Sequence, residues 1–265
     1  MYPFEIFLGM DLYSIFLLIG VISAFAVWRI CADRRNISAK LQNLVLFTAF
    51  FSVVLGYLGS VLFQAVYNFF ETGIFEITKN TGATFLGGLI SGAAVFLLIY
   101  FGGGAIIFRN GEKEQLTRFT DLLTIGGGCI SSAHAFGRIG CFFAGCCYGK
   151  PTEAWYGIRL YDMDYNTIPV QLFESGFLFL LFGIIMFLNM KKPDFKFGLV
   201  IYTVSYGIWR YFAEYMRGDD RGEFIIKCFT PSQFSSLVII AIGIILALIL
   251  YKIYYGKNAK KATDN

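Results

Sequence analysis

Five ionisable side chains stand inside stretches that are otherwise apolar: His134, Arg138, Glu174, Arg210 and Glu214. Placing an arginine at the middle of a bilayer costs about 2.5 to 3.5 kcal/mol on insertion scales, so such residues are typical of a polar interior site or a water-filled cavity. Guanidinium groups bind phosphate or carboxylate oxygens in a forked, two-bond geometry. This set of residues therefore predicts an anion-binding site within the apolar part of the molecule.

The spacing of these residues leaves two interpretations open. Arg210 and Glu214 are four residues apart, so on one helix they share a face and can form a purely structural ion pair. Arg138 has no acid at that spacing. His134 lies one helical turn before Arg138 and faces the same way, so an anion bound by Arg138 would have an imidazole beside it. A histidine in this setting can instead be a plain interhelical hydrogen-bond donor.

Residues 137–149 have the sequence GRIGCFFAGCCYG, in which four glycines permit irregular turns and close approach of the backbone. The segment predicts a helix that breaks up near the outer membrane surface. Non-helical backbone at that depth is tolerated only where it is buried in protein or lines a cavity. We therefore expect this segment to form the floor of a site.

Three cysteines in the same segment raise the alternative of a metal or redox site, because three thiols can bind zinc or form a labile disulfide. They are Cys141, Cys146 and Cys147. On a continuing helix the adjacent Cys146 and Cys147 would diverge, and neither a histidine nor a Cys-x-x-Cys pair completes a ligand set. We therefore expect no metal site and no disulfide framework.

The elements that hold these residues follow from composition. Of the 265 residues, 57% are hydrophobic and 15% are charged, whereas a soluble domain has about 25% charged residues. The chain is therefore predicted to be an all-α integral membrane protein, forming a single polytopic domain over residues 1–265. The net charge of +4 gives no reason to expect a nucleic-acid partner.

A transmembrane helix needs about 20 mostly apolar residues. The first apolar stretch follows Glu5 and Asp11 and precedes its basic residues, which is the reverse of a signal peptide, so we expect it to remain in the mature protein. Seven spans are predicted: 11–28, 43–67, 85–108, 122–148, 170–190, 197–215 and 231–255.

Lysine and arginine are concentrated in the segments that follow the first, third, fifth and seventh spans. By the positive-inside rule these segments are cytoplasmic, which predicts an extracytoplasmic N-terminus and a cytoplasmic C-terminus. The residues are Arg29, Arg34, Arg35, Lys40, Arg109, Lys113, Arg118, Lys191, Lys192, Lys196, Lys252, Lys257, Lys260 and Lys261.

Several motifs together resemble those of bacterial prolipoprotein diacylglyceryl transferases. Gly137-Arg138-Ile139-Gly140, continuing to Gly149 and preceded along the chain by Gly87-Gly88-Leu89, is similar to the signature of that family. Residues 169–174, PVQLFE, resemble its Pro-Ser-Gln-Leu-Tyr-Glu element. Tyr206-Gly207 with Arg210 and Glu214 resembles its Tyr-Gly-x-x-Arg-x-x-x-Glu element. Tyr13 and Gln233 stand where the family has a tyrosine and a glutamine, so the resemblance covers nearly the whole chain.

The resemblance implies a multi-pass enzyme of the bacterial cell membrane. Such an enzyme moves the diacylglyceryl group of phosphatidylglycerol onto the thiol of the lipobox cysteine in a preprolipoprotein signal peptide, releasing glycerol phosphate. No metal or organic cofactor is expected.

Roles for individual residues follow from the same resemblance. Arg138 is expected to bind the headgroup phosphate, and Arg210, oriented by Glu214, is expected to hold the same phosphate or the leaving group. His134, the one histidine in the sequence, is expected to help deprotonate the acceptor thiol, so a folded His134→Ala variant should lose transfer activity. The remaining expected substrate-binding residues are Tyr13, Gly137, Gly140, Gln171, Glu174 and Tyr206.

The chain also departs from the family pattern. Leu86 replaces the histidine that the family has before Gly-Gly-Leu, and a leucine cannot transfer a proton. The other replacements are Tyr57 for an arginine, Cys141 and Ala144 for two asparagines, and Cys146 for a glutamate.

These departures keep an alternative open, a divergent relative that uses another acceptor or binds lipid without catalysis. An anion transporter is a third interpretation. It is disfavoured because the polar residues lie toward the outer half of the spans, and because the sequence shows no internal repeat of the kind many transporters have.

Overall fold

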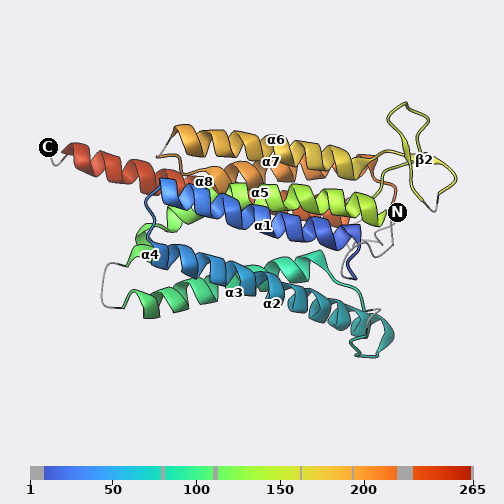
Figure 1. Cartoon of the computed structure of the whole chain (residues 1–265), viewed down its shortest axis with the longest axis horizontal. Coiled ribbons are helices and arrows are strands. Elements are labelled where there is room, and N and C mark those ends of the chain that lie inside the picture. The colour runs from blue at the N-terminus through green and yellow to red at the C-terminus, as the bar shows by residue number, and fades with distance from the viewer. Residues whose placement is uncertain are drawn as a thin grey trace. The chain divides into compact units, whose positions relative to one another are not determined.

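The structure is a computed structural model that describes residues 9–78, 81–109, 113–161, 163–192, 194–219 and 229–263 (Figure 1). Glu5 and Cys228 lie outside the described residues, and so does the side chain of Leu86. The helices are α1 (Leu12–Arg34), α2 (Ala39–Thr72), α3 (Phe85–Ile107), α4 (Glu114–Thr117), α5 (Phe119–Ala144), α6 (Val170–Lys191), α7 (Gly198–Ala213) and α8 (Pro231–Thr263).

Among the residues that the structure describes, five helical segments are long and apolar enough to cross a membrane: Leu12–Arg34, Ala39–Phe70, Gly87–Ile107, Val170–Lys191 and Pro231–Tyr254. The prediction of a helical, multi-pass membrane protein is therefore confirmed. The two other predicted spans fall on α5 and α7, which are helices that carry Arg138 and Arg210. The count of seven spans and the orientation of the termini stay predictions.

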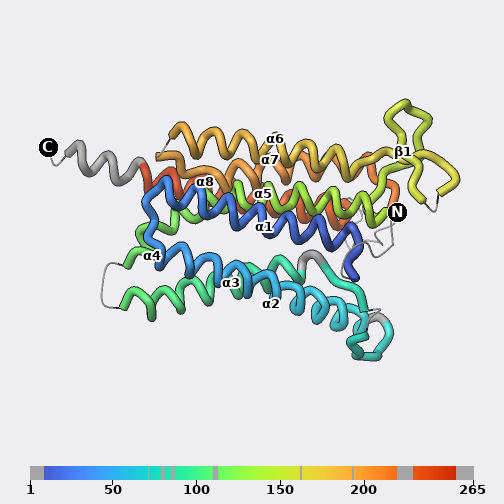
Figure 2. Tube along the Cα trace, viewed as in Figure 1, coloured from blue at the N-terminus to red at the C-terminus, as the bar shows by residue number. Residues whose placement is uncertain are grey.

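The described chain groups into two compact units, one formed by Met1–Arg35 with Thr120–Asn265 and the other by Asn36–Phe119. The first unit contains α1, α5, α6, α7 and α8, which run side by side in the trace (Figure 2). The second contains α2, α3 and α4. The single domain expected from the sequence stays a prediction.

In the first unit, small residues bring α5 close to its neighbours. A Cβ atom added to Gly198, at the start of α7, would lie 2.0 Å from the carbonyl oxygen of Thr124, so only glycine fits this crossing. Two serine hydroxyls join α5 to α6: Ser131 Oγ donates to the carbonyl of Leu178 at 2.9 Å, and Ser175 Oγ donates to that of Ala135 at 3.0 Å. Hydroxyl bonds of this kind hold helices together where apolar contact alone gives no advantage.

The core of this unit lies beside those contacts. Ala135, Leu178 and Tyr206 are buried together, and aromatic side chains pack around them. The rings of Phe177 and Trp209 stack with their centroids 4.6 Å apart. Tyr206 is also one of the predicted site residues, so the predicted site lies against the packed core.

One end of the first unit is fastened by charged residues near the ends of its helices. Arg35 Nη1 lies 2.6 Å from Asp121 Oδ1, and Arg35 Nη2 donates to Asn189 Oδ1 at 2.8 Å. Lys196 also binds Asp121. This cluster joins the end of α1 to the start of α5 and to the loop between α6 and α7. At the other end of α1, the Asp11 carboxylate accepts from Ser14 N at 2.8 Å and caps the start of the helix.

Helix α5 continues through Ala144 and ends where Gly145 takes a φ of +67°. The expected break within residues 137–149 is therefore confirmed, but it comes later than its first glycines, and Gly137 and Gly140 lie in regular helix. After the break, the chain forms a small antiparallel ladder that the sequence analysis did not predict. It pairs β1 (Ile158–Arg159) with β2 (Asn166–Thr167), and a bridge joins Gly149 to Arg217.

Candidate functional site

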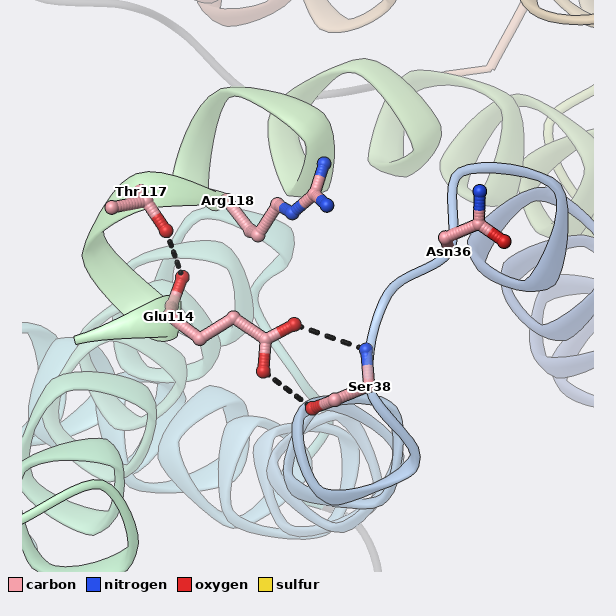
Figure 3. A pocket seen from close by; sticks show the side chains of 5 residues that line it. All are labelled: Asn36, Ser38, Glu114, Thr117 and Arg118. Atoms are coloured by element: carbon pink, nitrogen blue, oxygen red, sulfur yellow. Dashed lines mark hydrogen bonds between the residues drawn. The ribbon is translucent and has the colours of Figure 1, made fainter. Parts of the chain in front are cut away.

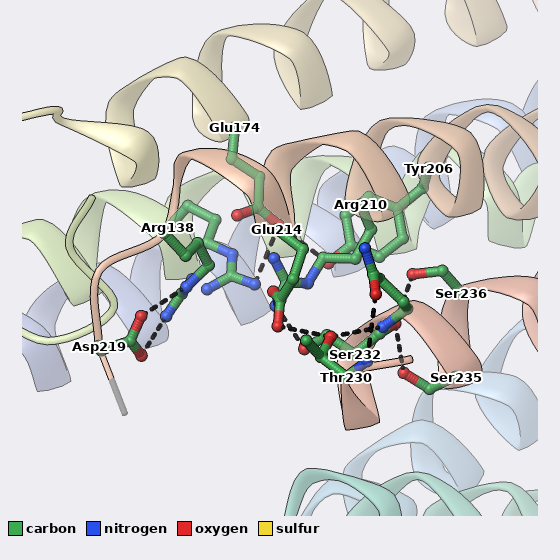
Figure 4. Close-up of polar contacts among 12 residues, drawn as sticks. Arg138, Glu174, Tyr206, Arg210, Glu214, Asp219, Thr230, Ser232, Ser235 and Ser236 are labelled. Carbon is green, nitrogen blue, oxygen red and sulfur yellow. Dashed lines mark hydrogen bonds and ion pairs between the residues drawn. The ribbon is translucent and has the colours of Figure 1, made fainter. Parts of the chain in front are cut away.

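An ion pair between α5 and α6 is the centre of the candidate site (Figure 4). Arg138 Nη2 lies 2.9 Å from Glu174 Oε1, and the Glu174 side chain is completely buried. The hydroxyl of Tyr206, on α7, donates to the same carboxylate oxygen at 2.9 Å. Three helices thus bring together three of the predicted site residues. The pairing itself could not be predicted from residue spacing, because the acid that compensates Arg138 lies on a different helix.

The pair keeps unused hydrogen-bonding capacity. Within the described part of the chain, Arg138 Nε and Glu174 Oε2 are buried and have no hydrogen-bond partner. A buried polar atom without a partner costs about 1 to 3 kcal/mol, so such atoms usually mark a place where a ligand, an ion or water binds. Arg138 therefore has a donor left over for an anion even while Glu174 holds it.

His134 lies in the same group, held by two tyrosines of α7. Its Nδ1 is 3.0 Å from the hydroxyl of Tyr202, and its ring centroid is 4.7 Å from that of Tyr206 in an edge-on arrangement. The rings of Tyr202 and Tyr206 stack at 5.7 Å. Tyr202 was not among the predicted site residues, although its position one turn before Tyr206 puts both on the same helix face.

Arg210 forms a second cluster between α7 and the start of α8. Its Nη2 lies 2.8 Å from Glu214 Oε2 and donates to Ser232 Oγ at 2.7 Å. Thr230 donates to the other oxygen of Glu214 at 2.9 Å. The local pair expected from the four-residue spacing is therefore present, with Glu214 in the 3-10 turn η1 (Glu214–Met216) that follows α7. Arg210 follows Tyr206 by four residues on α7, so the two clusters lie on neighbouring turns of that helix.

The predicted glycines serve the contact between α1 and α5. A Cβ atom on Gly140 would lie 3.2 Å from both the ring and the carbonyl oxygen of Tyr13, and one on Gly137 would lie 3.8 Å from Leu17. Tyr13 thus packs directly against the signature segment. Gln171 also contacts this region, since its Nε2 donates to the carbonyl of Cys146 at 2.7 Å. It supports the loop that follows α5.

That loop also contradicts part of the sequence analysis. Cys146 and Cys147 were expected to diverge on a continuing helix, but the helix has ended and Cys147 has a φ of +65°. The Sγ atoms of Cys141, Cys146 and Cys147 all lie within 4.8 Å of one another. The expected divergence, one of the two reasons given against a metal site, was therefore wrong.

Arg217 stands next to this loop and was not singled out from the sequence. Its side chain is 3% exposed and binds Asp219 through two bonds, Nε to Oδ1 at 2.8 Å and Nη2 to Oδ2 at 2.6 Å. Burial by itself would lower the pKa of Arg217, but the bonds to Asp219 outweigh it and the pKa is raised. Arg217 is therefore a permanent positive charge beside the thiols.

Two positions at which the chain departs from the family pattern lie in the second unit. Tyr57 is on α2 and is exposed, and Leu86 is on α3.

The second unit also contains a polar pocket of about 540 Å³ (Figure 3). Ser38 donates its backbone N–H to Glu114 Oε1 at 3.0 Å there, which fastens the start of α2 to α4. The pocket is lined by Asn36, Ser38, Glu114, Thr117 and Arg118.

Comparison with known proteins finds relatives that match most of this chain. A phosphatidylglycerol–prolipoprotein diacylglyceryl transferase from Clostridium tetani is 33% identical over 177 residues, which cover 64% of this chain and 65% of that protein. A second transferase of that name, from Clostridium perfringens, is 28% identical over 250 residues, which cover 91% of this chain and 92% of that protein. One from Finegoldia magna is 27% identical, with 98% of both chains covered.

The match to the family itself extends over residues 2–249. This range includes α5, α6 and α7, with Arg138, Glu174, Tyr206 and Arg210. The chain belongs to the prolipoprotein diacylglyceryl transferase family.

Proposed function

We propose that this chain transfers the diacylglyceryl group of phosphatidylglycerol to the thiol of the lipobox cysteine in a preprolipoprotein signal peptide. The printed names of the relatives from Clostridium and Finegoldia support this, since each is a phosphatidylglycerol–prolipoprotein diacylglyceryl transferase. In the reaction, the cysteine sulfur forms a thioether bond to the glyceryl carbon. The bond from that carbon to the phosphate oxygen breaks, and glycerol phosphate leaves.

The observation that carries the proposal is the Arg138–Glu174 pair. A guanidinium that is buried, charged and fixed by a carboxylate at 2.9 Å, with its Nε still without a partner among the described residues, suits a phosphate oxygen. Such a preorganised donor stabilises charge that develops as the leaving group departs. Arg210 supplies the second positive charge. Its own partners, Glu214 and Ser232, come from η1 and α8.

In this proposal His134 takes the proton from the acceptor thiol. A cysteine thiol has a pKa near 8.5 and attacks as the thiolate, so a nearby base accelerates the step. The Tyr202 hydroxyl lies 3.0 Å from Nδ1 and fixes the ring. In the proposed tautomer Nδ1 carries the hydrogen and donates to Tyr202, so Nε2 is the nitrogen that accepts the proton. Tyr13 and Tyr206 are proposed to bind headgroup oxygens. Gly137, Gly140 and Gln171 shape the site around them.

The proposal includes the membrane setting of the reaction. The enzyme spans the bacterial cell membrane seven times, with the N-terminus outside and the C-terminus in the cytoplasm, and binds both substrates from the bilayer. The alternative is a divergent relative of the family. It would keep this lipid-binding site but transfer the diacylglyceryl group to an acceptor other than the lipobox cysteine. The family match over residues 2–249 disfavours the transporter.

The test is an assay of the purified full-length protein in detergent with phosphatidylglycerol and a synthetic lipobox peptide. Mass spectrometry should detect the diacylglyceryl thioether on the peptide cysteine together with released glycerol phosphate. An Arg138→Ala variant and a peptide with serine in place of the cysteine are the controls. If neither product forms while an authentic enzyme is active in parallel, the transferase assignment is wrong. If glycerol phosphate forms without peptide modification, another acceptor is used.

A further inference from the structure

The break after α5 gathers three thiols at one point. Cys141 lies in the last turn of the helix, and Cys146 and Cys147 lie in the loop that follows it. Left-handed backbone at Gly145 and at Cys147, with φ of +67° and +65°, turns the chain back toward the helix. As a result, the three Sγ atoms all lie within 4.8 Å of one another. A non-glycine residue with positive φ is uncommon and is often a functional constraint.

The spacing of the sulfurs suits a single metal ion. Metal–sulfur bonds to zinc are about 2.3 Å long, so three sulfurs around one ion are about 4 Å apart. The thiols of this loop need only small shifts to reach that distance. Sets of cysteine ligands select copper(I) and zinc among the available ions. We propose that Cys141, Cys146 and Cys147 form a tris-thiolate site for a thiophilic d¹⁰ metal ion, which begins three residues after Arg138 on the same helix.

Hydrogen bonds hold the backbone of the loop in place. The Cys146 N–H donates to the carbonyl of Cys141 at 3.2 Å, and its own carbonyl accepts from Gln171 Nε2 at 2.7 Å. Further along, the Gly149 N–H donates to the carbonyl of Ile168 at 3.0 Å. Contacts from α6 and from the ladder thus fix the positions from which the thiols project. Such preorganisation reduces the entropy lost when a ligand binds.

The charge of the surroundings fits the same ligand. Three thiolates carry three negative charges, so a complex with a monovalent or divalent cation remains negative and needs a positive neighbour. Arg217 supplies it, because its side chain is buried and its backbone bridges to Gly149, two residues after Cys147. Its Nη1 is buried and has no hydrogen-bond partner among the residues that the structure describes. Hydrogen bonds from outside the ligand set commonly orient metal ligands, and their loss typically costs about 10- to 100-fold in affinity.

The first test is metal binding by the full-length protein in detergent, after reduction and removal of metal under argon. Cadmium is the probe, because its thiolate complexes have an ultraviolet charge-transfer band. The band should grow to saturation at one ion per chain. Parallel titrations with copper(I) and with zinc, each against a competing chelator, then identify the preferred ion. X-ray absorption at the metal edge should count three sulfur ligands. None of these readouts depends on transferase activity.

Matched serine variants separate this site from other thiols. Cys146→Ser should weaken cadmium binding about 100-fold or more. Because the Cys146 side chain is exposed, we expect this variant to fold normally, and its melting temperature without metal should equal that of the original protein. Cys129→Ser, on α5 but outside the group, should bind like the original protein. Arg217→Gln should weaken binding about 10- to 100-fold.

Three results would overturn the proposal. They are no stoichiometric band, equal binding by the Cys146→Ser variant, and a disulfide between two of the three thiols in protein isolated without reductant.

Discussion

Arg138 on α5 and Glu174 on α6 form a buried ion pair, with Arg138 Nη2 2.9 Å from Glu174 Oε1. The carboxylate oxygen in this pair also accepts from the Tyr206 hydroxyl at 2.9 Å, so one acid holds an arginine and a tyrosine from two other helices. The other oxygen of Glu174 and the Nε of Arg138 have no hydrogen-bond partner in the described residues. The pair thus holds three helices of the candidate site together and leaves one donor of Arg138 for an anion.

Glu174→Gln should destabilise the protein strongly. The amide keeps the shape of the side chain but removes its charge, which leaves Arg138 buried without compensation. Removing one partner of a buried pair typically costs about 3 to 5 kcal/mol. Thermal unfolding in detergent should show a clearly lowered melting temperature. The control is Asp164→Asn, which removes the acid of the exposed Arg159–Asp164 pair and should leave the melting temperature unchanged. Equal melting temperatures for both variants would show that the buried pair does not stabilise the fold.

Arg138→Ala and Arg210→Ala should abolish transfer while the protein still inserts into the membrane. Loss of one preorganised donor to a developing negative charge typically lowers kcat by about 100- to 1,000-fold. Lysine variants should restore only part of the rate, because an ammonium cannot form the forked bond to phosphate. The measurement is the thioether yield per folded chain, with insertion checked by membrane fractionation. Wild-type rates in either alanine variant would refute the anion-binding role.

His134→Ala should lower the rate of transfer by about 100-fold or more, the usual contribution of a positioned base. Tyr202→Phe keeps the ring that stacks on Tyr206 and removes only the hydroxyl that binds His134 Nδ1. We expect a smaller loss in that variant, because the base remains but is less well oriented. Rates should be measured with substrate concentrations varied, so that kcat and KM are separated. Unchanged kcat in folded His134→Ala would assign the base elsewhere.

Gly198→Ala should destabilise the crossing of α5 and α7. Its new Cβ atom would lie 2.0 Å from the carbonyl oxygen of Thr124, whereas a Cβ atom on Gly183, in α6, has no atom within 4 Å. Overpacking of this kind typically costs about 1 to 3 kcal/mol. Gly183→Ala is the matched control and should unfold at or above the original temperature, since alanine favours helix. If both variants melt alike, the contact does not determine stability.

Local composition explains how much could be predicted from the sequence. Apolar length alone predicted the helices that are long and apolar enough to cross a membrane. Arginines within apolar stretches marked the candidate site, because an unpaired charge in such a stretch is costly wherever the helix packs. The Arg210–Glu214 pair was predictable as well, because four residues of helix place both side chains on one face.

Only the tertiary structure decided which residues meet across helices. That Glu174 compensates Arg138, and that Tyr202 holds His134, depends on how α5, α6 and α7 pack, and no local spacing encodes that. The convergence of Cys141, Cys146 and Cys147 had the same origin. Two residues of left-handed backbone end α5 and reverse the chain. The contacts of the loop with α6 and the ladder then hold the thiols together, because these bonds join segments far apart in the sequence.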